Sequence, residues 1–274
     1  MTPSLHIAQW LDPMARIRLR LSFGIHAEGL TDLRATHAVR RDFAVQEITA
    51  KVPEPHQQVF EAIDTRVCWL HLLWNTYRQL FGDVAKVELL NRAAPGWAKV
   101  QQDVLLEGVM LGLTRLTDRL ETGGRQNLVL ERLKELASKG NVGLSREVDD
   151  AVVSAKKACD VLRKHRDKRL AHLDLEVSLD SSLLPPFSRE SIEAALEKVR
   201  ELMNKLNHHF RGGATMYEDT FAQGDAECLM ECIEDGLKFR FLRRNHGKLT
   251  EPEVRDALQT RALRLADLQK IELE

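Results

Sequence analysis

Cysteine is scarce in this sequence, and its spacing does not fit the common zinc-binding patterns. The four cysteines form no Cys-x-x-Cys pair. Cys228 and Cys232 are four residues apart and would share one face of a helix, but no second pair of cysteines or histidines has matching spacing. We therefore expect no metal site and no cofactor, and we interpret the cysteines as buried core thiols of a reduced compartment.

Long apolar runs and an excess of one charge are also missing. No run approaches the roughly 20 apolar residues that cross a bilayer. The N-terminus has no signal-peptide layout, because Asp12 and several arginines interrupt its apolar positions. The 40 basic and 41 acidic residues leave a net charge of −1, so nucleic-acid binding would have to come from a local patch. We expect a cytoplasmic protein without a membrane partner.

The first 54 residues differ from the rest of the chain. The segment ARIRLRLSFGI, residues 15–25, alternates apolar and polar side chains in the manner of a β-strand. No partner strand is evident in the sequence that follows it. Three interpretations stay open for residues 1–54: a small β appendage, a strand lent to a partner, or a poorly ordered extension.

From Pro55 onward the apolar positions follow the 3.6-residue period of amphipathic helices. The helix expected at 95–119 is apolar on nearly all sides in its middle, which favours a place at the centre of a bundle. We predict an all-α fold, an antiparallel helical bundle over 55–238, followed by a basic connector and a C-terminal helix over 239–274. The helices are expected at 59–81, 83–94, 95–119, 127–140, 145–173, 188–210, 224–237 and from 250.

The stretch RKHRDKRLAHLD, residues 163–174, concentrates positive charge in this nearly neutral protein. Two interpretations compete for it: cations that complement the negative end of a helix, or a site that holds an anion. Asp167 and Asp174 favour the second, because carboxylates gain nothing at that helix end. Between positions 156 and 172, two aspartates (160 and 167) face seven lysines and arginines, at positions 156, 157, 163, 164, 166, 168 and 169.

Ideal helix geometry places Arg166, Arg169 and His172 along one polar strip, whereas Lys164 and Lys168 point elsewhere. Arginine forks match phosphate oxygens, and histidine exchanges protons near neutral pH. Such a set suits RNA cleavage by attack of the 2′-hydroxyl on the adjacent phosphorus. Arg166 and His172 are about 120° apart around an ideal helix. A helix end, or a second copy across a dimer axis, would be needed to bring them together.

The segment RDKRLAH resembles the motif of the HEPN superfamily, in which an arginine and a polar residue precede a histidine by a fixed spacing. The order of TYRQLFG, LGLTRLTDR, the motif and GDAECLMECIEDGL is similar to the AbiU-type abortive-infection branch, over residues 55–238. The resemblance implies a metal-independent endoribonuclease acting as a toxin or in phage defence. It also implies a homodimer in which two motif copies form one cleft.

By this resemblance Arg166 and His172 are the catalytic pair, and Asp167 is the polar residue that orients one of them. We expect RNA as the substrate and an antitoxin protein as a candidate partner. Some branches carry a tyrosine two residues after the histidine as a target for modification; here that place is Asp174. The substrate-binding cations would be Arg163, Lys168 and Arg169.

Two further expectations stay open. Arg115 and Asp118 either support the motif from a second helix or form a salt bridge within their own helix, three residues apart. The alternative function is a non-catalytic HEPN bundle that binds RNA, a nucleotide or a partner protein without turnover.

Overall fold

The computed structural model describes residues 52–54, 56–170, 174–220, 224–245, 248 and 250–252, which all belong to one compact unit, Gln46–Glu274. The strand-like segment 15–25 lies outside the described residues. So do His172 and all but the first residues of the expected C-terminal helix.

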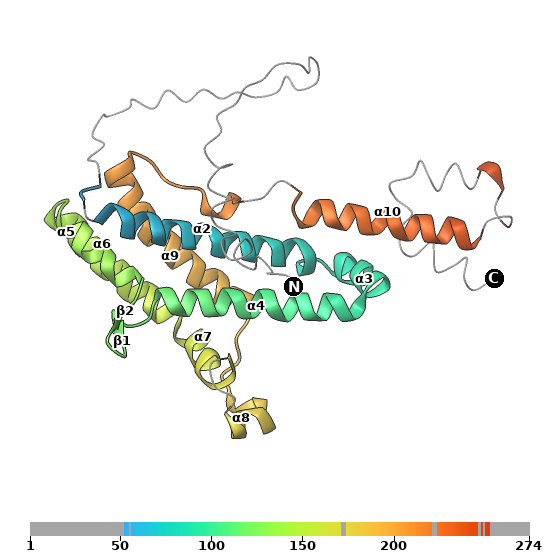
Figure 1. Ribbon diagram of the computed structural model, residues 1–274, viewed down its shortest axis with the longest axis horizontal. Helices are drawn as coiled ribbons and strands as arrows, with labels where there is room; N and C mark the ends of the chain where they lie inside the picture. The colour runs from blue at the N-terminus through green and yellow to red at the C-terminus, as the bar shows by residue number, and fades with distance from the viewer. Residues whose placement is uncertain are drawn as a thin grey trace, which may run out of the picture. The chain divides into compact units, whose positions relative to one another are not determined.

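The described chain is a bundle of helices, which confirms the predicted all-α class (Figure 1). Its only strands in the described ranges are two short ones, β1 (Glu121–Thr122) and β2 (Arg125–Gln126). The α-helices are α2 (His56–Phe81), α3 (Val84–Ala93), α4 (Pro95–Leu116), α5 (Leu133–Ser138), α6 (Val142–Ala158), α7 (Asp160–His165), α8 (Leu175–Leu179), α9 (Arg189–Arg211) and α10 (Ala226–Arg244).

Helix α2 organises the bundle. It packs along α4, and it also contacts α3, α5, α9 and the first part of α10 (Figure 1). A second close pair is α6 with α9. The predicted end of α2 and the predicted start of α9 hold: α2 ends at Phe81, and α9 follows Ser188, which forms a capping box with Ser191.

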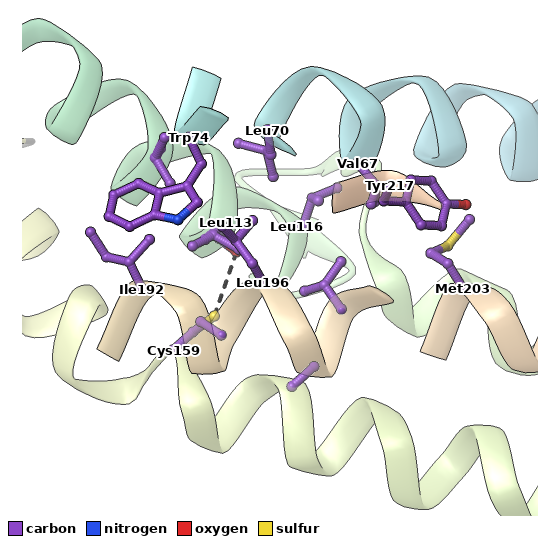
Figure 2. Packing of buried hydrophobic residues seen from close by; sticks show 14 of the residues in the cluster. Val67, Leu70, Trp74, Leu113, Leu116, Cys159, Ile192, Leu196, Met203 and Tyr217 are labelled. Atoms are coloured by element: carbon purple, nitrogen blue, oxygen red, sulfur yellow. Dashed lines mark hydrogen bonds between the residues drawn. The ribbon is translucent and has the colours of Figure 1, made fainter. Parts of the chain in front are cut away.

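The core is built mainly from the apolar stripes of helices α2, α4, α6 and α9. Leu113 of α4 is fully buried, and Cys159 directs its thiol toward the Leu113 carbonyl oxygen, 4.0 Å away (Figure 2). Trp74 lies above this contact and stacks on Tyr77 with ring centroids 4.9 Å apart. Burial of these large side chains is the main favourable contribution to folding.

The first half of helix α4 lies at the surface of the bundle, whereas every apolar residue of its middle from Leu105 to Leu116 is buried or half-buried. Val100 and Val104 are each 56% exposed, and Trp97 is 41% exposed. The opposite face, including Val109 and Leu113, is fully buried. The helix therefore covers the core with one face and leaves an apolar stripe on the other.

Four other boundaries differ from the sequence prediction. The loop expected near residue 121 is a β-hairpin, with Gly123 and Gly124 both at positive φ in its turn. Asn127 caps no helix; its amide holds the hairpin by donating to the Arg119 carbonyl oxygen. Helix α10 continues through Gly236 to Arg244, so the expected boundary at 238/239 falls inside it. The single helix expected over 145–173 is interrupted at Cys159.

Candidate functional site

The arginine of the motif lies between two carboxylates from different parts of the chain. Arg166 Nη1 donates to Asp118 Oδ2 at 2.7 Å, and Arg166 Nε donates to Asp167 Oδ1 at 2.7 Å. Nη2 lies 2.6 Å from the same Asp167 oxygen. The Arg166 side chain is only 15% exposed, whereas that of Asp167 is 50% exposed. The guanidinium is therefore largely enclosed, with its orientation fixed from two sides.

This environment acts on the pKa of Arg166 in two opposing ways. Burial disfavours the charged guanidinium, but the hydrogen bonds and charges of Asp167 and Asp118 outweigh it. The pKa of Arg166 is consequently raised above its ordinary value, and the side chain stays positively charged at any physiological pH.

A second arginine joins the motif to the end of α4. Arg163 Nη1 donates to Asp118 Oδ1 at 3.0 Å, and its Nη2 donates to the Thr117 carbonyl oxygen and hydroxyl at 3.0 and 2.8 Å. The carbonyl groups at the C-terminus of a helix lack partners within the helix. Arg163 therefore caps α4 from a neighbouring helix, and Asp118 bridges Arg163 and Arg166.

The backbone changes its hydrogen-bonding pattern at the motif. Helix α7 ends at His165, and Arg166–Leu170 form a π-helical turn, labelled η3. A π-turn bonds residue i to residue i+5, so side chains no longer follow the 100° spacing of an α-helix. The angular separations that the sequence predicted from an ideal helix do not apply here. Such turns occur frequently at functional sites.

Asp174, which stands where some branches of the superfamily carry a tyrosine, has a structural role. Its side chain accepts a hydrogen bond from the Val177 amide and so caps α8. Its backbone amide donates to the Lys168 carbonyl oxygen at 3.1 Å, and its carboxylate lies 3.7 Å from the Lys168 ammonium group. Asp174 therefore joins the start of α8 to the π-turn through Lys168.

His165, directly before the catalytic candidate Arg166, is buried. Its Nε2 lies 2.7 Å from the Pro185 carbonyl oxygen, and its ring packs edge-on against Phe187. These contacts attach the loop between α8 and α9 to the start of the π-turn. The proximity of His165 to Leu162 on a helical wheel was the signal in the sequence that could have indicated burial.

The remaining site candidates are distributed unevenly. Arg169 and Lys168 are exposed on the π-turn, as is Lys164 on the turn before it. Arg115 is exposed on α4 and does not pair with Asp118, whose described partners are Arg163 and Arg166. The interpretation of an internal Arg115–Asp118 salt bridge is therefore wrong. Asp118 reaches the motif, Arg115 does not join this cluster, and His172 lies outside the described residues.

The sequence did not indicate that Arg163 and Arg166 share one carboxylate. Arg163 and Arg166 are three residues apart in the chain, and the approach of α4 to α7 and η3 brings Asp118 between them. The described part of the chain, this site included, holds no group of three or more potential metal ligands, and no helix in it is long and apolar enough to cross a membrane.

An all-helical bundle with an Arg-Asp pair at the start of a turn that leads to a histidine has the features of a HEPN domain. The family model HEPN_AbiU2, described as AbiU2, matches residues 54–229, and the chain belongs to this family. The comparisons with curated proteins and with solved structures returned no match.

Proposed function

We propose that this protein is a metal-independent endoribonuclease of the cytoplasm that acts as a toxin or in abortive infection. The observation that carries the proposal is the fixed orientation of Arg166 within the Arg-Asp-x4-His motif of an AbiU2 family member. Arginine has five N–H groups, and in Arg166 one on Nε and one on Nη1 donate to Asp167 and Asp118. In the proposed complex the remaining N–H groups would donate to the oxygens of a phosphodiester.

In the proposed reaction the 2′-oxygen of RNA attacks the adjacent phosphorus. His172 of one copy accepts the 2′-hydroxyl proton, while His172 of the partner subunit, protonated, donates a proton to the departing 5′-oxygen. The bond from phosphorus to the 5′-oxygen breaks, giving a 2′,3′-cyclic phosphate and a 5′-hydroxyl. Arg166 stabilises the charge that develops on the phosphoryl oxygens.

The proposed cleft requires a homodimer, because two motif copies then face one substrate. The exposed cations of the motif, Lys168 and Arg169, would hold the RNA backbone on either side of the scissile phosphate. We expect sedimentation at low ionic strength to give twice the chain mass. A strictly monomeric protein that cleaves RNA would contradict the shared cleft.

The test is the substitution of Arg166→Ala and His172→Ala, each alone, scored for RNA cleavage and for growth inhibition in cells. Both variants are expected to lose activity, and chelation of metals is expected to leave wild-type cleavage unchanged. Lys164→Ala is the matched control, since Lys164 is exposed one turn before the motif and has no role in the proposal. Undiminished cleavage by both motif variants would contradict the assignment.

A second candidate function is RNA binding without turnover. The observation that favours it is the charge balance at the motif, where Asp118 and Asp167 offset Arg163 and Arg166. A wild-type protein that retains RNA in filter binding, loses it on Arg166→Ala and never produces a cyclic phosphate end would support this function over the first. If RNA is not retained, the same binding measurement with a nucleotide or a partner protein in place of RNA would test the other forms of this function.

A further inference from the structure

We propose that Asp118 is a positioning residue for Arg166, and that Arg163 serves the same brace instead of contacting substrate. The inference rests on the proposed function, because the orientation of Arg166 matters only if it holds a phosphate. The name brace is used here for the four side chains that join the end of α4 to the motif: Thr117, Asp118, Arg163 and Arg166.

The position of Asp118 needs an explanation beyond helix stability. It follows the last turn of α4, where the helix dipole disfavours a carboxylate. Its two oxygens are instead each used by a different arginine, at 3.0 and 2.7 Å. The carboxylate of Asp118 is thus unfavourable for its own helix but fixes the guanidinium groups of Arg163 and Arg166.

The two contacts of Arg166 come from different directions. Asp167 takes the Nε side of the guanidinium, and Asp118 takes Nη1 from α4. One carboxylate alone would leave the planar group free to rotate about its side-chain torsions, whereas two from separate elements fix it. Because the side chain is 15% exposed, the Asp118 interaction is also less screened by solvent than a surface ion pair.

Arg163 has the contacts of a structural cation. Its donors go to the Thr117 carbonyl oxygen, the Thr117 hydroxyl and Asp118, so its guanidinium is committed to the C-terminus of α4. Its side chain is 24% exposed. Arg163 consequently holds Asp118 in place, and the substrate-binding role expected for it from the sequence passes to the exposed cations of the π-turn.

The kinetic test is Asp118→Asn, which keeps the shape of the side chain and removes its charge. We expect kcat for RNA cleavage to fall by about 10- to 100-fold, since small displacements of a catalytic group have effects of this size. KM is expected to fall as well, because a negative charge beside the phosphate has been removed. A purely structural loss would not lower kcat and KM together.

Asp103→Asn is the matched control, because Asp103 lies on α4, the helix that Asp118 follows, and pairs with Lys99 at 2.7 Å on the exposed surface. It should leave both kinetic constants unchanged. An Asp118→Asn variant with the kcat of the control, or with a raised KM and an unchanged kcat, would overturn the inference. Asp118→Glu restores the charge and is expected to recover part of kcat; it also serves as the test if Asp118→Asn does not fold.

A readout independent of cleavage separates this inference from the proposed function. In the full chain labelled with ¹⁵N-arginine, the guanidinium signals of Arg163 and Arg166 should show slow hydrogen exchange, which Asp118→Asn accelerates and Asp103→Asn does not. Loss of one signal in Arg166→Lys assigns it. Unchanged exchange in Asp118→Asn overturns the brace. Accelerated exchange in a wild-type protein that cleaves no RNA would keep the brace and reject the nuclease.

Discussion

Arg166 Nη1 and Asp118 Oδ2 lie 2.7 Å apart, although the two residues are 48 positions apart in the sequence. The contact joins the start of a π-helical turn to the end of α4, a helix that covers the core with one face. The orientation of the motif therefore depends on the packing of α4 on α2, and variants in that packing are informative about the fold that supports the site.

The first prediction concerns the contact between α2 and α4. A Cβ atom at Gly112 would overlap the Leu70 side chain, which is buried in the core, so Gly112→Ala is expected to lower the free energy of unfolding by about 1–3 kcal/mol. Gly96→Ala is the control on the same helix. Nothing lies within 4 Å of its added Cβ atom, and alanine is expected to stabilise by about 0.5–1 kcal/mol. Urea denaturation of both variants measures the difference; equal effects would contradict the close approach.

The second prediction concerns the buried polar network between α2 and α9. Tyr217 is fully buried; its hydroxyl donates to Asp64 and accepts from Asn207 at 3.0 Å. Tyr217→Phe takes one buried hydrogen-bond partner from each of Asp64 and Asn207 and should cost about 1–3 kcal/mol. The exposed Ser154→Ala should stay within about 0.5 kcal/mol.

A double-mutant cycle tests whether the cost comes from the hydroxyl contact itself. Asp64 also accepts from Arg211 at 2.8 Å, so its substitution has an effect of its own. Combining Asp64→Ala with Tyr217→Phe removes both partners of the contact, and the interaction energy should be favourable. Strictly additive effects of the two substitutions would show that the Tyr217–Asp64 contact contributes nothing.

The third prediction is a dependence of stability on pH caused by His71. Burial, followed by the charge of Arg200, lowers the pKa of this histidine from 6.5 to about 4, against the opposing effect of Glu218. Below about pH 6.5 the unfolded chain takes up a proton that the folded protein accepts only near pH 4. The free energy of unfolding should therefore fall as the pH falls through this window, by at most about 3 kcal/mol from this group.

The measurement is urea denaturation of wild type and His71→Gln at several pH values between 4 and 7. The difference between the two curves should be largest at the acidic end, where only the wild type loses stability through this group. His208→Gln, at an exposed position on α9, should follow the wild-type curve. Parallel curves for wild type and His71→Gln would contradict a depressed pKa at His71.

The fourth prediction concerns the cysteines. Cys228 and Cys232 are exposed, which corrects the expectation that all four are core thiols; Cys159 is buried as expected. Burial raises the pKa of both Cys159 and Cys68 to about 11, so these two thiols stay protonated and unreactive. Iodoacetamide at pH 8 should modify Cys228 and Cys232 in the native protein and all four in urea, as peptide mass mapping would show. Rapid native labelling of Cys159 would contradict its place in the core.

The sequence predicted those features of the fold whose physical cause lies within a few neighbouring residues. Helix α2 and the Ser188 cap of α9 depend on periodicity and capping within a few residues, and both were predicted. The exposed stripe of α4, with Val104 on it, was not, because periodicity cannot tell which partner covers an apolar face.

The site shows the same division. The sequence placed Arg166 and Asp167 in one motif, and it left two partners open for Asp118. The choice between them depends on how α4 meets α7 and η3, a long-range contact that no local pattern encodes. The π-turn likewise replaces regular helical bonding over only five residues, Arg166–Leu170, and its composition does not distinguish it from an α-helix.

The cap that Arg163 forms on the carbonyl end of α4 has a consequence for protein engineering. The segment from Arg163 to the motif histidine cannot be transferred alone, because Thr117 and Asp118 supply hydrogen-bond acceptors that hold Arg163 and Arg166. A transplant of residues 163–174 into another helical bundle would bring unpaired guanidinium groups to an unprepared surface. A functional graft would have to include the end of α4 as well, held at the same distance from the grafted motif as in this protein.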